Sequence, residues 1–199
     1  MSQAPGTGSI TGLVLAGGRG QRMGGVDKGL QLFRGKPLVE HAIARLAPQV
    51  REILVSANRN VETYAALAAR VLVDDSSDAI ERYPGPLAGI LAGLRAARTP
   101  WLAVVPCDAP LLPADLVERL AAAASAAGGT GAVAQRGGRL EPVCCLLSTS
   151  LSDDLAGYLA SGRRKVEGWI AGHAVPAPFE RADDAGAFAN FNTLDELRG

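Results

Sequence analysis

The fold is decided by the stretch Ile10-Thr-Gly-Leu-Val-Leu-Ala16 and by the loop that follows it, Gly17-Gly-Arg-Gly-Gln-Arg-Met-Gly-Gly-Val-Asp-Lys-Gly29. An apolar run that empties into glycines is typical of a buried strand. Because glycine lacks a Cβ, the backbone N–H groups of such a loop can line a concavity that favours anions. Arg19, Arg22 and Lys28 add full positive charges. We therefore expect a strand that ends in a polyphosphate-binding loop.

Two familiar phosphate loops do not match this spacing. A dinucleotide-binding fingerprint that starts at Gly18 needs glycine at position 23, where Met23 stands. A Walker loop needs serine or threonine after its lysine, but Gly29 follows Lys28. The loop thus belongs to neither class, and the alternative to a dedicated phosphate site is a glycine-rich turn of some other α/β enzyme.

Length and composition favour a single domain without macromolecular partners of strong charge. The chain has 199 residues, enough for one well-buried sheet, and we expect a disordered leader over residues 1–9 and one domain over residues 10–199. Its 20 basic and 20 acidic residues balance, so no overall field attracts nucleic acid or an anionic membrane. With no apolar run of about 18 residues and no signal-like start, we expect a cytoplasmic protein.

The cysteines give no sign of a disulfide framework or of a zinc site. Cys107, Cys144 and Cys145 are odd in number, two of them are adjacent, and none has C-x-x-C spacing. We expect buried small side chains.

After the first loop, apolar runs alternate with segments of helical periodicity. Runs at 52–56, 71–73 and 101–105 predict parallel strands joined by helices. The runs at 131–135 and 140–147 flank a short glycine turn and predict one antiparallel strand late in the chain. The expected fold class is α/β: a Rossmann-like, three-layer α/β/α fold with a mostly parallel sheet.

Open α/β sheets bind ligands at the carboxyl edge of their strands, and this chain has polar side chains at those positions. Ser56 and Asn58 are candidates for contact with a base or ribose, and Asp75 follows the next strand. Asp108 lies between prolines after the fourth strand and is a candidate oxygen ligand for Mg²⁺. The structural alternative for these residues is helix or turn capping.

A second informative stretch is Pro84-Gly-Pro-Leu-Ala-Gly89. Its prolines stiffen a turn just before a predicted helix, so the backbone groups are held in place and can recognise a flat base. Gly85, Leu87 and Gly89 are the candidate residues.

Two late segments admit two interpretations each. Asn190 and Asn192 alternate with Phe191, so in an extended segment both amides face one side, either toward a second substrate or as turn caps. Arg163-Arg-Lys165 suits either a helix carboxyl terminus or a cradle for a second, phosphorylated substrate. Spacing alone assigns no role to Glu141-Pro142.

Four patterns occur together in this chain: L-A-G-G-x-x-x-R-M-G-G-x-D-K, G-P-L-A-G, P-C-D-x-P and F-x-N-x-N-T. In this order they resemble the nucleotidyltransferase superfamily and, within it, the molybdenum cofactor guanylyltransferases. The resemblance implies transfer of GMP from GTP to the phosphate of molybdenum-bound molybdopterin, which gives the guanine dinucleotide cofactor and releases pyrophosphate. It also implies transient contact with molybdenum insertion proteins or apo-molybdoenzymes.

The resemblance and the spacing together assign roles to residues of this sequence. The expected catalytic residues are Arg22, Lys28 and Asp108, with Asp108 as the ligand of Mg²⁺. The expected contacts to the second substrate are Gly25, Asn190 and Asn192. The expected GTP contacts are Leu15, Ala16, Gly17, Gly18, Lys28, Ser56, Asn58, Asp75, Gly85, Leu87, Gly89 and Asp108.

One position of this sequence differs from the family pattern, and three alternative functions remain open. The V-N-A-N-R segment of the family reads Val55-Ser-Ala-Asn-Arg59 here, so either Ser56 or Asn58 makes the contact. A molybdopterin cytidylyltransferase usually reads Leu-Ala-Ala-Gly, whereas this chain has Leu15-Ala-Gly-Gly18. A sugar-phosphate nucleotidyltransferase is usually longer. A non-catalytic GTP-binding regulator would bind GTP and Mg²⁺ without releasing pyrophosphate.

Overall fold

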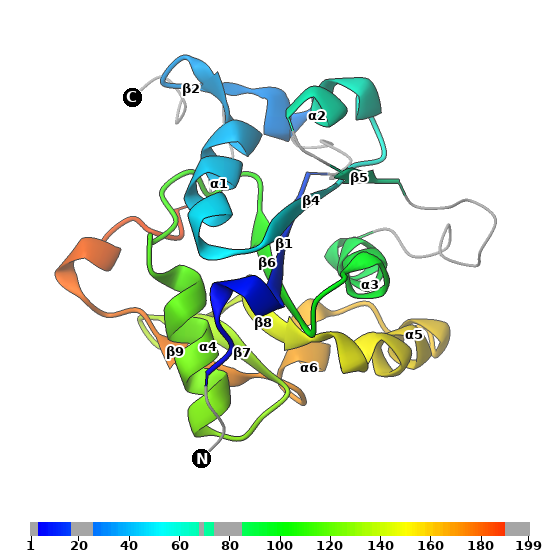
Figure 1. Ribbon diagram of the computed structural model, residues 1–199, viewed down its shortest axis with the longest axis vertical. Coiled ribbons are helices and arrows are strands. Elements are labelled where there is room, and N and C mark those ends of the chain that lie inside the picture. Colours follow the sequence, from blue (N-terminus) through cyan, green and yellow to red (C-terminus); the bar gives the residue numbers. More distant parts are fainter. Residues whose placement is uncertain (1–3, 17–25, 68–69, 74–84, 190–199) are drawn as a thin grey trace.

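Seven strands form one sheet in the order β5-β4-β1-β6-β8-β7-β9, and helices pack on both of its faces (Figure 1). The computed structural model describes residues 4–16, 26–67, 70–73 and 85–189. The strands of the sheet are β1 Ile10–Leu15, β4 Glu52–Ser56, β5 Arg70–Leu72, β6 Trp101–Pro106, β7 Gly131–Arg136, β8 Arg139–Ser148 and β9 Val175–Pro178. The helices are α1 Leu38–Leu46, α2 Val61–Leu67, α3 Pro86–Ala96, α4 Leu116–Ala126, α5 Ser152–Ala160 and α6 Val166–Ile170. A small hairpin joins β2 Leu32–Phe33 to β3 Lys36–Pro37.

The strand directions confirm the predicted fold class. β1 pairs in parallel with β4 and β6, and β4 pairs in parallel with β5. β8 runs antiparallel to both β6 and β7, so it is the late antiparallel strand that the sequence predicts. The sequence did not predict β9, which pairs in parallel with β7 at the edge of the sheet. Its V-P-A-P sequence lacks two backbone N–H groups, which only an edge strand tolerates.

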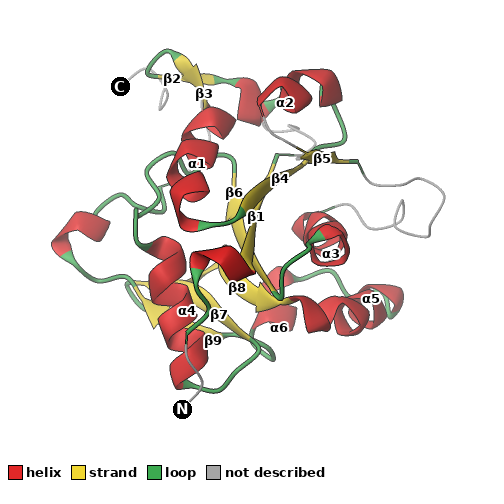
Figure 2. Cartoon of the chain, viewed as in Figure 1, coloured by secondary structure: helices red, strands yellow, loops and turns green. Residues whose placement is uncertain are grey.

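The two faces of the sheet are covered by different helices, as Figure 2 shows. Along β1, Leu13 packs in the cluster that contains α3, α5 and α6, while Ile10 and Val14 pack in the cluster of α1 and α4. This alternation is the period of two expected for a strand buried on both faces. Gly93 allows α3 to lie close to β1, since a Cβ there would be 2.6 Å from Leu13 Cδ2.

Some local features qualify the predictions. Within the expected leader, Thr7–Ser9 forms a 3-10 turn in which Ser9 Oγ donates to the Gly6 carbonyl at 2.7 Å. Among the described residues, no helix is long and apolar enough to cross a membrane. The three cysteines are free and buried, as predicted. Burial raises the pKa of Cys145 to about 12 and raises the pKa of the other two thiols as well.

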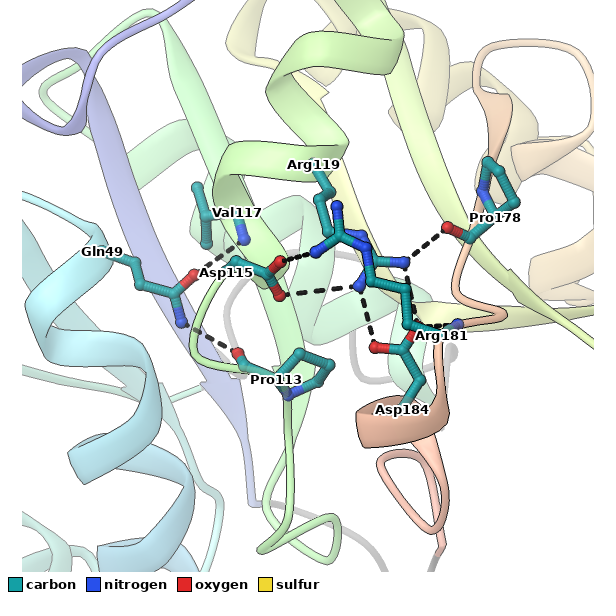
Figure 3. A network of polar contacts seen from close by, with 8 residues as sticks. All are labelled: Gln49, Pro113, Asp115, Val117, Arg119, Pro178, Arg181 and Asp184. Carbon is teal, nitrogen blue, oxygen red and sulfur yellow. Dashed lines mark hydrogen bonds and ion pairs between the residues drawn. The ribbon is translucent and has the colours of Figure 1, made fainter.

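A polar network attaches the chain after β9 to α4 (Figure 3). Arg119 on α4 donates to both carboxylate oxygens of Asp184, at 2.8 and 3.0 Å. Arg181 donates to Asp115 at 2.8 Å, just before α4 begins. Hydrogen bonding by Arg119 lowers the pKa of Asp184, which is 3% exposed. The network therefore fixes the path of the chain toward its last described residues.

Candidate functional site

The carboxyl ends of three neighbouring strands meet at one edge of the sheet. Leu15 on β1 lies in register with Ser56 on β4 and with Pro106 on β6. Beyond the strands, the Leu15 carbonyl accepts from the Cys107 N–H at 3.1 Å, and the Ala16 N–H donates to the Ser56 carbonyl at 2.9 Å. The three loops that leave this edge thus start from fixed positions, as a ligand site at the end of an α/β sheet requires.

Two predicted catalytic residues meet at this edge. Lys28 begins a 3-10 turn, Lys28–Leu30, and its Nζ forms an ion pair with Asp108 Oδ2, from a residue 80 positions later in the chain. Both side chains keep some contact with solvent, at 22% and 17% exposure. A cation and a carboxylate are therefore both accessible where a polyphosphate and its counter-ion would bind.

Asp27, which was not among the predicted site residues, anchors the turn that carries Lys28. Asp27 Oδ1 accepts from the Tyr64 hydroxyl at 2.6 Å and from the Gly29 N–H at 3.2 Å. Asp27 Oδ2 accepts from Asn60 Nδ2 at 2.8 Å. Burial and the hydrogen bond to Asp27 raise the pKa of Tyr64, so its hydroxyl remains a donor at any physiological pH. Asp27 thus ties the Lys28 turn to the start of α2.

Gly29 shows how closely these groups are packed. A Cβ at Gly29 would lie 2.4 Å from the Tyr64 hydroxyl and 3.3 Å from Cys107 Sγ. Tyr64 is fully buried, so its ring has little freedom to move aside. The M-G-G-x-D-K pattern contains Asp27, and Gly29 directly follows it. Tyr64 lies 37 residues away from Asp27 and shows no signal of its own beyond an apolar helix face.

The structure separates the two candidates at the end of β4. Ser56 is 5% exposed and lies under α3, where a Cβ at Gly89 would come within 2.8 Å of its Oγ. Asn58 is exposed. Gly85 precedes α3 with φ 137°, a conformation that favours glycine. The Leu87 side chain is buried in the core, so only its backbone can face a ligand.

Other predicted site residues lie outside the described part of the chain. They are Gly17, Gly18, Arg22, Gly25, Asp75, Asn190 and Asn192.

The contacts of the basic segment after α5 favour the helix-terminus interpretation. Arg164 donates to the Leu159 carbonyl in the last turn of α5, at 2.8 Å. Arg163 donates to Ser161 Oγ at 2.8 Å, and its guanidinium lies 4.2 Å from the centre of the Tyr158 ring.

The described residues fit a metal ion that is held largely by its substrate. They contain no group of three or more His, Cys, Asp or Glu side chains that could hold an ion by itself. Mg²⁺ is commonly bound by one or two protein carboxylates together with phosphate oxygens and water. Asp108, partly exposed at the sheet edge, suits the role of such a carboxylate.

Comparison with known proteins identifies the family. A family model described as the MobA-like NTP transferase domain matches residues 12–176. The chain belongs to the MobA-like NTP transferases. A molybdenum cofactor guanylyltransferase from Ralstonia nicotianae is 50% identical to this family member over 202 residues, which cover 96% of each chain. These findings confirm the resemblance seen in the sequence and the prediction of a nucleotidyltransferase.

Solved structures share the fold of this MobA-like NTP transferase. The crystal structure of molybdopterin-guanine dinucleotide biosynthesis protein A from Archaeoglobus fulgidus superposes with a TM-score of 0.74. It is 22% identical and the match covers 94% of this chain and 95% of that one. A Mycobacterium tuberculosis protein in complex with manganese superposes with a TM-score of 0.65, at 16% identity and 96% coverage of each chain.

Proposed function

We propose that this MobA-like NTP transferase transfers GMP from GTP to the phosphate of molybdenum-bound molybdopterin, which forms the guanine dinucleotide and releases pyrophosphate. The observation that carries the proposal is the 50% identity, over nearly the whole chain, to a relative named for this guanylyltransferase activity. The meeting of Lys28 and Asp108 at the carboxyl edge of the sheet supports it, because these are the groups that phosphoryl chemistry needs.

The reaction asks the protein mainly to position two anions and to neutralise growing charge. When the molybdopterin phosphate attacks the α-phosphorus, negative charge builds on the leaving pyrophosphate and on the equatorial oxygens. Lys28, Arg22 and the backbone N–H groups of the glycine loop would stabilise that charge. No protein nucleophile is required, and burial raises the pKa of Cys107, so the thiol beside the site stays protonated.

We propose Mg²⁺ as the cofactor, held by Asp108 and by oxygens of the triphosphate. When bound, the cation supplies additional neutralisation of phosphate charge. A structural neighbour that was solved with manganese supports a divalent cation at this fold, and Mn²⁺ and Mg²⁺ share a preference for oxygen ligands. The tie between Asp27, Tyr64 and Gly29 keeps the Lys28 amine beside the Asp108 carboxylate before substrate arrives.

The solvent exposure of the candidate side chains indicates which of them can contact the nucleotide. Ser56 is buried by α3, so we propose that Asn58 contacts the base or ribose, while the backbone from Gly85 to Gly89 reads the guanine edge. Gly17, Gly18 and Asp75 remain proposed GTP contacts. Gly25, Asn190 and Asn192 remain proposed contacts to molybdopterin. Delivery to insertion proteins or apo-molybdoenzymes is the corresponding proposal for partners.

The test is pyrophosphate release with each of the four nucleoside triphosphates, with and without molybdopterin. We expect release with GTP only when molybdopterin is present. A wrong base leaves polar groups of the site unpaired, so kcat/KM for CTP should be lower by about 10²-fold, which corresponds to about 2.7 kcal/mol. Preference for CTP would make the protein a cytidylyltransferase. Binding of GTP without any molybdopterin-dependent release would make it a regulator.

A further inference from the structure

A cavity of about 360 Å³ opens beside the β7–β8 hairpin, away from the elements assigned to GTP. Among the described residues, those that line it are Arg136, Arg139, Glu141, Phe188 and Ala189. In the sheet order, β8 and β7 follow β6 on one side, while β1, β4 and β5 lie on the other. The cavity and the nucleotide elements are thus on opposite sides of β6, the strand that leads to Asp108.

The cavity lies toward the same edge of the sheet as Asp108. β8 runs antiparallel to β6, with Cys145 opposite Val104, so the start of β8 lies toward the carboxyl end of β6. Glu141 is near that start, and Asp108 follows the end of β6. Both carboxylates also influence the same buried thiol: burial is the main cause of the raised pKa of Cys144, and the charges of Glu141 and Asp108 raise it further.

Three charged side chains line this cavity. Among the residues that the structure describes, no hydrogen bond or ion pair engages the side chains of Arg136, Arg139 or Glu141. Burial raises the pKa of Glu141, while the two nearby arginines oppose that shift. A half-buried carboxylate accepts two parallel N–H bonds, and a guanidinium binds anions. Glu141 with the two arginines therefore suits a ligand that has two adjacent N–H donors on one ring edge and also carries negative charge.

Phe188 forms an apolar wall of the cavity, and side chains outside the cavity hold it in place. Phe188 is 7% exposed, and its ring meets the ring of Phe179 edge-to-face at 5.2 Å. The guanidinium of Arg119 lies 3.7 Å from the centre of the Phe179 ring. This guanidinium is held in turn by its hydrogen bond to Asp184 (Figure 3). This packing gives the cavity a preformed apolar side on which a flat ring can lie.

We propose that this cavity receives the pterin end of the second substrate. Glu141 accepts from the ring N–H and the exocyclic amino group of the 2-amino-4-oxopyrimidine edge, and Arg136 and Arg139 neutralise the anionic groups attached to the pterin. The inference rests on the proposed function, whose second substrate is a pterin phosphate. It extends the expected role of the chain end, because Ala189 in the cavity wall directly precedes Asn190.

Guanine presents the same pair of N–H donors as a pterin, so the experiment must distinguish binding of the guanine of GTP from binding of the pterin. Glu141→Gln replaces one acceptor oxygen by a donor, and Arg139→Gln removes one positive charge. Each variant is titrated with GTP, with molybdopterin and with the fluorescent probe 6-hydroxymethylpterin monophosphate. Loss of a charge-assisted pair should weaken molybdopterin and probe binding by about tenfold to a hundredfold in Glu141→Gln. GTP affinity should change by less than about threefold.

Matched controls exist beside the turn of this hairpin and at the opposite sheet edge. Glu180, which follows β9, accepts from the N–H of Gly137 in the β7–β8 turn at 2.8 Å and is exposed. Glu180→Gln therefore removes a carboxylate charge that lies beside this turn and outside the lining of the cavity. Arg98 is exposed just before β6 begins, so Arg98→Gln controls for loss of an arginine. Both controls should keep wild-type affinity for the probe. Thermal melting of every variant shows that the fold is retained.

The possible results distinguish a failure of this inference from a failure of the proposed function. Unchanged probe and molybdopterin affinity in Glu141→Gln and Arg139→Gln would overturn the inference even if the wild-type protein transfers GMP. A loss confined to GTP would assign the cavity to guanine and overturn it as well. A wild-type protein that binds the probe through Glu141 but does not transfer GMP would contradict the proposed function alone.

Discussion

Replacing Gly29 by alanine should release the turn that carries Lys28. The new Cβ would sit 2.4 Å from the Tyr64 hydroxyl, so that oxygen must move, and its 2.6 Å hydrogen bond to Asp27 must break or stretch. A lost hydrogen bond to a charged group destabilises by about 1.5–3 kcal/mol. Overpacking around a buried ring adds about 1–3 kcal/mol. We expect Gly29→Ala to lower the free energy of unfolding by about 2.5–6 kcal/mol.

The same change should slow catalysis, because Lys28 lies between Asp27 and Gly29. A misplacement of about 1 Å in a charge-stabilising group can reduce turnover by about 10²-fold. Tyr64→Phe removes the oxygen that clashes and should alone lower the unfolding free energy by about 1.5–3 kcal/mol. In the double variant the clash is absent and the shared hydrogen bond is lost only once, so its destabilisation should fall short of the sum of the single effects by about 2.5–6 kcal/mol.

The assay is a double-mutant cycle by chemical denaturation, with kcat measured on each folded variant. Gly157→Ala is the control, since α5 leaves open space at that position and alanine favours a helix by up to about 1 kcal/mol. Additive losses in the double variant would refute the contact between Gly29 and Tyr64. Normal kcat in a folded Gly29→Ala protein would refute the link from this contact to Lys28.

Further predictions concern the carboxylates and the end of β4. Asp108→Asn should lower turnover by about 10²-fold or more while GTP affinity stays within about tenfold, and near-normal turnover would remove Asp108 from the catalytic set. Asn58→Ala should weaken GTP binding, whereas Ser56→Ala should change mainly stability; the reverse pattern in paired titrations would contradict the burial argument. The folded-state pKa of Asp184 is lowered, so its stabilisation is full above the unfolded value of about 3.9 and is lost as pH falls below it. Asp184→Asn should therefore destabilise at pH 7 by about 1.5–3 kcal/mol and lose less stability on acidification than the wild type in denaturation curves from pH 7 to pH 3.

Features that depend on local pattern could be predicted from the sequence, and features that depend on packing could not. Strands β1, β4 and β6 follow from apolar runs, of which the first and third end in glycine or proline. The edge where Lys28 and Asp108 meet follows from the parallel order of these strands. The choice between Ser56 and Asn58 needed the position of α3, which no spacing gives. The Asp27 to Tyr64 bond joins the start of the Lys28 turn to helix α2 through tertiary structure alone.

In the late half of the sheet, too, local pattern predicts some features and packing determines the others. The β7–β8 hairpin follows from two apolar runs around a glycine turn. β9 was missed because its two prolines argue against a strand unless its edge position is known. Glu141 received no role from its spacing because its place in a cavity with two arginines exists only in the folded chain.

The central claim is that GMP itself is transferred to the molybdopterin phosphate, without a protein intermediate. The most direct measurement uses GTP labelled at the α-phosphate, with molybdopterin and Mg²⁺, followed by separation of protein, nucleotides and product and mass analysis of the product. Our account predicts that the label moves into molybdopterin guanine dinucleotide, in an amount equal to the pyrophosphate released and with none on the protein. Label recovered as free GMP, or bound covalently to the protein, would contradict it.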